Sequence, residues 1–113
     1  MSKQGEHLYE GMYILSATLS DDARQKALEK ITSGITTRGG EICKMFDQGR
    51  RKLAYEINNK REGYYYILYF SISTKVMNDL WREYHLNEDL LRFLTLRTES
   101  VPEKLEFKSI VQE

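Results

Sequence analysis

Three adjacent cations follow a glycine near the middle of the chain, in the order Gly49-Arg50-Arg51-Lys52. Guanidinium and ammonium groups bind phosphate oxygens, and three of them at a bend can reach more than one phosphate of a nucleic acid. The same residue types on an exposed strand also prevent edge-to-edge aggregation. The run therefore leaves two interpretations open, a phosphate contact and a solvated edge. Arg92 and Arg97, further along the chain, could add a second, weaker contact.

The cations are concentrated in one part of the sequence. Over all 113 residues, 17 Lys and Arg balance 17 Asp and Glu, so the formal net charge is zero. This balance argues against a protein that coats nucleic acid with its whole surface. Between Lys44 and Arg61, however, six bases face two acids, Asp47 and Glu56, which gives a local charge of +4. The neutral total therefore conceals a basic segment.

Residues that could support catalysis or metal binding are few and isolated. Cys43 is the single cysteine, which excludes an internal disulfide and a thiolate metal cluster and is typical of a protein in a reducing cytoplasm. A catalytic thiol needs an activating base, and the spacing of His7 and His85 places neither beside Cys43. We therefore expect no enzyme activity, no metal site and no cofactor. No apolar run reaches the ~20 residues that a membrane span requires.

The apolar pattern of the first half of the chain alternates between strand and helix periods. Leu8 to Leu15 is rich in aromatic and aliphatic residues and predicts a strand. Ser20, followed by two aspartates, predicts the start of a helix, and glycine after Arg38 predicts its end. Extended segments are then expected at Glu41 to Asp47 and at Leu53 to Ile57, with a bulge or bend at Gly49 between them.

The second half repeats the alternation. Asn58 to Gly63 predicts a turn, and Tyr64 to Ile72 is the strongest strand prediction in the chain. Ser73 or Thr74 is expected to cap a second helix, with Trp81 and Tyr84 in its buried stripe. Leu90 to Thr98 predicts the last strand.

The element order βαββαβ predicts an α+β fold. The compact solution is the ferredoxin-like arrangement, with four strands in one antiparallel sheet and both helices on one face. We expect a single domain over residues 1–99 and a short charged C-terminal tail over residues 100–113. A fold that is so widely reused does not identify a function.

The sheet face away from the helices is expected to be unusually apolar. In the strand at Tyr64 to Ile72, we assign the alternation that begins with Tyr64 and Tyr66 to the helix side. The open side then carries Tyr65, Ile67 and Tyr69, which is typical of a partner-binding face. Aromatic residues on such a face stack bases in an RNA recognition motif, but the positions that would stack are Tyr64 and Tyr66. We therefore favour a protein partner for Tyr65, Ile67 and Tyr69.

The stretch from Gly49 to Ile57, followed by Gly63-Tyr64-Tyr65, resembles the signature of the bacterial small-subunit ribosomal protein six family. The similarity continues at Tyr9-Glu10, at Val76 to Leu80 and at Leu90 to Leu94, and it covers residues 8–99.

This resemblance implies a ferredoxin-like, non-catalytic protein of the cytoplasmic ribosome. It further implies a heterodimer with small-subunit ribosomal protein eighteen, and joint binding of the two proteins to the central domain of the small-subunit ribosomal RNA during assembly. Arg50, Arg51 and Lys52 match the basic segment of the family motif, and Arg92 matches a basic position of the last strand. The alternatives are a small-ligand regulatory module, a binding module of the RNA recognition motif type, a cofactor-free dimeric enzyme, and a translational regulator that uses the same RNA surface.

Overall fold

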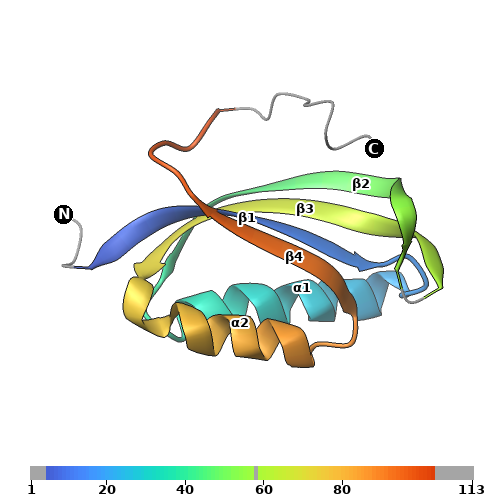
Figure 1. The fold of residues 1–113 in the computed structure, drawn as a ribbon, viewed down its shortest axis with the longest axis horizontal. Helices are drawn as coiled ribbons and strands as arrows, with labels where there is room; N and C mark the ends of the chain where they lie inside the picture. Colours follow the sequence, from blue (N-terminus) through green and yellow to red (C-terminus); the bar gives the residue numbers. More distant parts are fainter. Residues whose placement is uncertain (1–4, 58, 104–113) are drawn as a thin grey trace.

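The computed structural model describes residues 5–57 and 59–103 of the chain. Its elements are β1 (Glu6–Ser16), α1 (Asp21–Thr36), β2 (Glu41–Ile57), β3 (Lys60–Ser73), a 3-10 turn η1 (Thr74–Val76), α2 (Met77–Leu86) and β4 (Leu90–Arg97). The strands form one antiparallel sheet in the order β2-β3-β1-β4. Both helices lie on the same side of it (Figure 1). The predicted ferredoxin-like fold is confirmed. Most of the expected tail, residues 104–113, lies outside the described residues.

Helix α1 begins and ends where its sequence signals predict. The Ser20 hydroxyl accepts a hydrogen bond from the backbone N–H of Ala23, and Asp21 and Asp22 occupy the first turn at the positive end of the helix dipole. After the helix, Gly39 adopts a φ of 84°, a left-handed conformation that glycine reaches without a steric penalty. The buried stripe of α1 packs on the sheet.

The hairpin formed by β2 and β3 is longer than the sequence pattern predicts. The chain remains in β2 from Glu41 to Ile57, and β3 already begins at Lys60, within the segment expected to be a turn. Two features make this continuity possible. Gly49 (φ 77°) forms a bulge that lets the strand bend without ending, and Asn59 (φ 65°) lies in a tight reversal between the paired residues Ile57 and Lys60.

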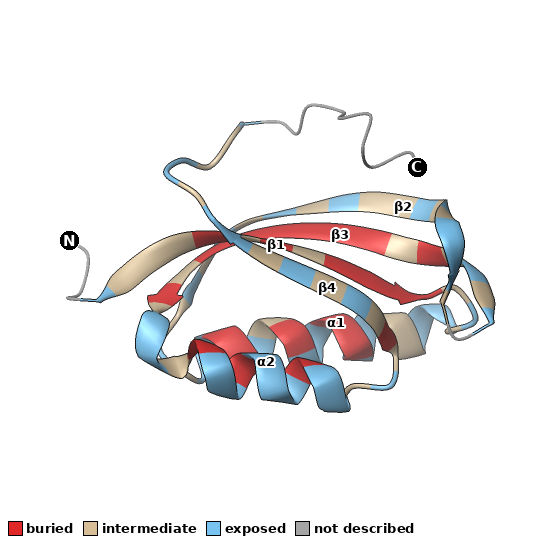
Figure 2. Cartoon of the chain, in the orientation of Figure 1, coloured by how far each residue is buried: buried red, intermediate tan, exposed pale blue. Residues whose placement is uncertain are grey.

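The core lies between the sheet and the helices, and β3 supplies most of it. Tyr66, Leu68, Phe70 and Ile72 all belong to this buried cluster, as their alternation predicts. In Figure 2, buried residues run along β3 and along the sides of α1 and α2 that face the sheet. Trp81 corrects one expectation. Its ring is partly exposed, and its indole N–H donates to the Thr95 hydroxyl at 3.3 Å, whereas Tyr84 is fully packed in the core.

A glycine makes room for a buried tyrosine pair. The hydroxyls of Tyr13 and Tyr84 are 2.8 Å apart, and their rings meet edge to face. The Tyr13 ring folds back over Gly11, where an added Cβ would lie 2.6 Å from the Tyr13 hydroxyl oxygen. Glycine at position 11 is therefore needed for the close approach of the Tyr13 side chain.

Candidate functional site

The open face of the sheet is the side away from α1 and α2, and its central residues are already covered. Tyr65, Ile67 and Tyr69 point to this face, as their alternation predicts, yet each is only 8% exposed or less. Ile67 pairs in register with Met12 on β1 and with Phe46 on β2, and the Phe46 ring meets Tyr69 edge to face. These three residues therefore form a second packed layer, and the accessible surface lies beside them.

Tyr69 is fixed in this layer by Glu10. Its hydroxyl donates to a Glu10 carboxylate oxygen at 2.5 Å. Burial, together with this hydrogen bond and the adjacent negative charge, raises the pKa of Tyr69 above its ordinary value. The chain after β4 also crosses toward β2 here, because Lys44, which pairs with Tyr69, donates to the backbone carbonyl of Glu103.

The exposed apolar residues of the open face lie on β4. Leu94 and Leu96 are 49% and 51% exposed, and both point to the open side because their partners in register are Met12 and Glu10. Among the described strands β4 pairs only with β1, so its outer edge also has unpaired backbone groups. We call Leu94, Leu96 and this edge the apolar end of the open face.

The three cations of the basic run do not share a surface. Register places Arg51 opposite Gly63, on the open side, and places Arg50 and Lys52 opposite Tyr64 and Glu62, on the other side. Arg50 forms an ion pair with Glu62 at 2.7 Å, which compensates its charge. Lys52 is exposed. Adjacent residues of a strand point in opposite directions, so a tripeptide of cations is divided between two faces.

Arg51 belongs to a group of side chains at the hairpin end of the open face. Arg51 and Arg92 both lie close enough to Tyr65 for their positive charges to offset the rise in its pKa that burial causes. The Arg92 guanidinium lies 5.0 Å from the centre of the Tyr55 ring and donates a hydrogen bond to the Tyr55 hydroxyl. We call Arg51, Tyr55, Tyr65 and Arg92 the arginine cluster.

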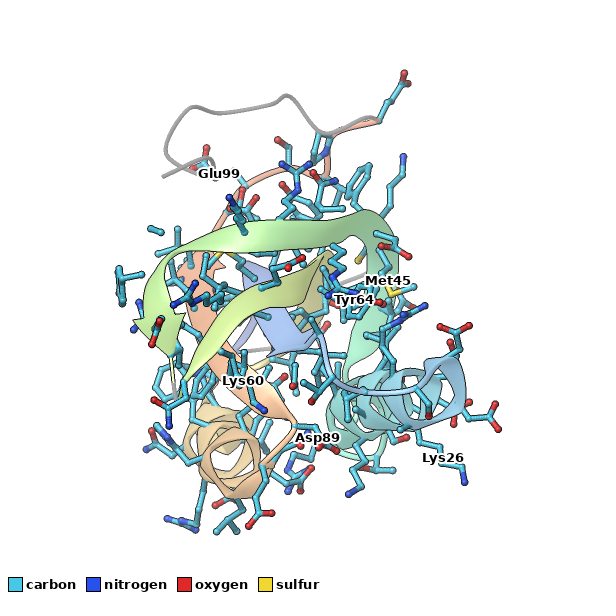
Figure 3. The ribbon with its side chains drawn as sticks, turned by 90° about the vertical axis from the view of Figure 1, so that its right-hand side faces the viewer. Lys26, Met45, Lys60, Tyr64, Asp89 and Glu99 are labelled. Carbon is cyan, nitrogen blue, oxygen red and sulfur yellow. The ribbon has the colours of Figure 1, made fainter. Side chains whose placement is uncertain are left out.

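The curvature of the hairpin brings this cluster together. Figure 3 views the molecule from the hairpin end, and it shows β2 arching over the sheet on the side opposite the helices. Tyr55, on β2, thereby reaches Arg92 on β4, although β3 and β1 lie between these strands in the sheet. The bulge at Gly49 contributes to this bend.

Arg97 lies apart from the cluster. It pairs in register with Tyr9, on the helix side of the sheet, and its guanidinium contacts the imidazole of His7. Of the five predicted RNA-contacting cations, the structure thus brings Arg51 and Arg92 together and places Arg50, Lys52 and Arg97 elsewhere. Arg92 forms no ion pair with a carboxylate of residues 5–57 or 59–103.

Tyr55 belongs to the arginine cluster although no sequence motif singles it out as a binding residue. Its side chain is 58% exposed, the most of any aromatic residue among those described. A signal was present, since Arg51, Leu53 and Tyr55 alternate along an exposed strand and must therefore share one face. What the alternation does not reveal is the bend that carries Tyr55 to Arg92.

Other candidate sites are not supported. Burial and the charge of Glu41 raise the pKa of the Cys43 thiol, which is the opposite of what a nucleophilic thiolate needs. Within the described residues, no three His, Cys, Asp or Glu side chains gather as a metal site would require. Neither of the described helices combines the length and apolar character needed to cross a membrane. Tyr64 and Tyr66, the stacking positions of an RNA recognition motif, lie on the helix side, where Arg24 covers the Tyr64 ring at 4.1 Å.

Comparison with known proteins identifies the family. The family model for ribosomal protein S6 matches residues 8–97. The small ribosomal subunit protein bS6 of Protochlamydia amoebophila is 63% identical over 110 residues, covering 97% of this chain and 96% of that protein. The corresponding protein of Chlamydia abortus is 62% identical, covering 97% and 98%. The crystal structure of 30S ribosomal protein S6 from Thermotoga maritima superimposes with a TM-score of 0.78 at 31% identity, covering 82% of this chain and 88% of that one. The chain therefore belongs to the ribosomal protein S6 family.

Proposed function

We propose that this protein binds the central domain of the small-subunit ribosomal RNA jointly with small-subunit ribosomal protein eighteen during assembly. The family consists of non-enzymatic proteins of the small ribosomal subunit, so the protein is a component of the cytoplasmic ribosome. Its membership also favours this role over a small-ligand regulatory module. The observation that supports the finer proposal is the division of the open face into an apolar end and an arginine cluster.

The apolar end fits a protein partner. Two half-exposed leucines beside an unpaired strand edge offer apolar area and backbone hydrogen bonds at the same place. Apolar aliphatic area beside a free strand edge suits a protein better than RNA, whose surface is dominated by phosphate charge. We assign protein eighteen to this end, next to the packed layer of Tyr65, Ile67 and Tyr69.

The arginine cluster fits RNA. Arg51 and Arg92 lie together on one surface, and Arg92 has no carboxylate partner among the described residues. Two other cations of the hairpin, Arg50 and Arg61, form ion pairs with Glu62 and Glu56. A chain of zero net charge with one such cluster binds RNA weakly by itself, because few phosphates are neutralised. A second protein must supply the remaining contacts.

The proposal is tested by measuring RNA affinity with and without the partner. A central-domain fragment of the small-subunit ribosomal RNA is titrated with the protein alone, and then with an equimolar mixture of the protein and protein eighteen. We expect weak binding alone and much tighter binding of the mixture. Equal affinity in the two titrations would contradict joint binding.

Salt dependence tests the assignment of the cations. Replacement of Arg50, Arg51 and Lys52 together by alanine should flatten the dependence of log affinity on log salt by up to ~0.9 for each lost phosphate contact. The faces of β2 sharpen this test. Arg51→Ala should account for more of the change than Lys52→Ala, which removes the same charge from the opposite face. An unchanged slope in the triple variant would identify the run as a solvated edge.

A further inference from the structure

We propose that Tyr55 stacks on an unpaired base of the RNA, and that Arg51 and Arg92 bind the phosphates that flank this nucleotide. This inference rests on the proposed function and deepens it, because it names the kind of nucleotide and the side chain that receives it. An aromatic ring provides a flat, apolar surface that is complementary to a base.

The Tyr55 ring is held in place before any ligand arrives. Arg92 lies 5.0 Å from the ring centre and also donates to the hydroxyl, so one guanidinium fixes both the position and the tilt of the ring. More than half of the side chain remains exposed. A ring that is fixed and exposed loses little conformational entropy on stacking, which is the property of a preformed binding platform.

The charges around the ring select an anionic ligand. Arg51 and Arg92 lie on the same face of the sheet, on β2 and on β4, and the positive charge of each offsets the rise in the pKa of Tyr65 that burial causes. Glu56 and Glu62, the acids of this part of the hairpin, form ion pairs with Arg61 and Arg50. Arg51 donates to the Gln48 backbone carbonyl and side-chain amide oxygen, which holds its guanidinium on this face, so phosphates next to the stacked base would meet Arg92 and, beside it, Arg51.

The geometry favours RNA over a peptide at this end. An acidic peptide would satisfy the arginines but would leave the exposed face of Tyr55 unused. The apolar surface that a protein partner needs lies at Leu94 and Leu96, further along β4. A paired base is also excluded as the ligand, because both of its faces are already stacked within the duplex; the nucleotide must lie in a loop, bulge or other unpaired stretch.

Substitutions at Tyr55 separate stacking from charge. In the presence of protein eighteen, Tyr55→Ala should weaken binding of the central-domain RNA on the order of 5- to 100-fold without changing the salt slope. Tyr55→Phe keeps the ring but loses the hydrogen bond from Arg92, so it should weaken binding much less than Tyr55→Ala does. Arg92→Gln should weaken binding and flatten the salt slope. Trp81→Ala, which removes an exposed aromatic ring from the helix side, is the matched control and should have no effect.

A fluorescence measurement tests stacking directly. Tyr55→Trp in a Trp81→Phe background places the only tryptophan of the chain at the proposed platform. A base stacked on this indole should quench its emission when the RNA is added. Heparin, a polyanion without bases, should bind to the cations without quenching. Quenching of equal size with heparin would contradict the proposal.

The outcomes distinguish a failure of the stacking inference from a failure of the proposed function. Wild-type RNA affinity in Tyr55→Ala, together with weaker binding in Arg51→Ala, would overturn the stacking inference and leave the proposed function intact. If Tyr55→Ala weakens the affinity for protein eighteen in the absence of RNA, the stacking inference is overturned and Tyr55 is a protein contact. If the wild-type pair of proteins does not bind the RNA, the proposed function itself fails.

Discussion

The two faces of β3 have similar residues and are both buried, although helices cover only one of them. Leu68 and Phe70 face the helices and are completely buried, whereas Ile67 and Tyr69 face the open side and are buried almost as well. The contrast appears only in the neighbouring strands. On the helix side, α1 and α2 cover the sheet out to β4, while on the open side Leu94 and Leu96 remain half exposed. The centre of each face therefore stabilises the fold, and only the margin of the open face is available for binding.

This difference shows how a four-stranded sheet can combine stability with recognition. A residue on a central strand is flanked on both sides, so its neighbours bury it even where no helix covers the sheet. A residue on an edge strand has neighbours on one side only. For this reason we expect the loss in free energy of unfolding that a substitution causes to depend on the strand that carries the residue as well as on the face of the sheet.

Leu68→Ala should cause the largest loss of stability. Leu68 is fully buried among the helix-side residues, so removal of its side chain leaves a cavity and should lower the free energy of unfolding by about 2–5 kcal/mol. Leu94→Ala is the matched variant on the margin of the open face, and it should cost less than about 1 kcal/mol. Urea unfolding at neutral pH measures both. Similar losses would show that the open face is packed out to β4.

Gly11→Ala should be the next most destabilising change. The new Cβ would lie 2.6 Å from the hydroxyl oxygen and 2.7 Å from a ring carbon of Tyr13. The Tyr13 ring cannot easily move, because its hydroxyl is hydrogen-bonded to that of Tyr84 inside the core. Overpacking of this kind costs about 1–3 kcal/mol, measurable by the same unfolding experiment. A loss below about 0.5 kcal/mol would mean that the ring has room to shift.

Most of the fold could be predicted because its signals are local. Ser20 and the aspartates that follow it define the start of α1 through a cap and a dipole, both of which act within one helical turn. The alternation from Tyr64 to Ile72 assigns each side chain to a face of β3 correctly. The length of the hairpin could not be predicted, because Lys60, Arg61 and Glu62 have a turn-like composition and are extended only through cross-strand pairing.

The candidate site was harder to predict because it depends on burial and curvature. Alternation places Tyr65 on the open side, but it cannot show that Tyr65 is buried there. In the sequence, Arg50, Arg51 and Lys52 form one basic run, whereas the pairing of β2 with β3 divides them between two faces. The contact between Tyr55 and Arg92 joins residues 37 positions apart through the bend of the hairpin, and no local pattern encodes that distance.

Removal of both exposed leucines should affect binding more than stability. Leu94→Ala combined with Leu96→Ala deletes apolar area that a partner would cover, and should weaken the affinity for protein eighteen by about 5- to 30-fold, which corresponds to ~1–2 kcal/mol. Titration calorimetry measures the affinity. Leu86→Ala is the control, because this residue is even more exposed but lies at the end of α2, on the helix side. An equal effect of the control would show that exposed apolar area alone, without regard to face, governs the association.

The smallest predicted effect concerns the packed centre of the open face and depends on pH. In the folded protein, burial and the bond to Glu10 raise the pKa of Tyr69 above the value of about 10 that applies in the unfolded chain. Above pH 10 the unfolded chain therefore binds fewer protons than the folded protein, so this contribution to stability is complete below pH 10 and is lost as the pH rises.

Tyr69→Phe should cost about 1 kcal/mol at neutral pH, the net value of one hydrogen bond. The difference between wild type and variant should shrink in urea unfolding at pH 10 and 11, although Tyr13 and Tyr84, whose pKa values are also raised, keep both proteins sensitive to alkali. A difference that stays constant with pH would mean that Tyr69 does not hold its proton through Glu10, and that the centre of the open face is less well packed than the centre of the helix side.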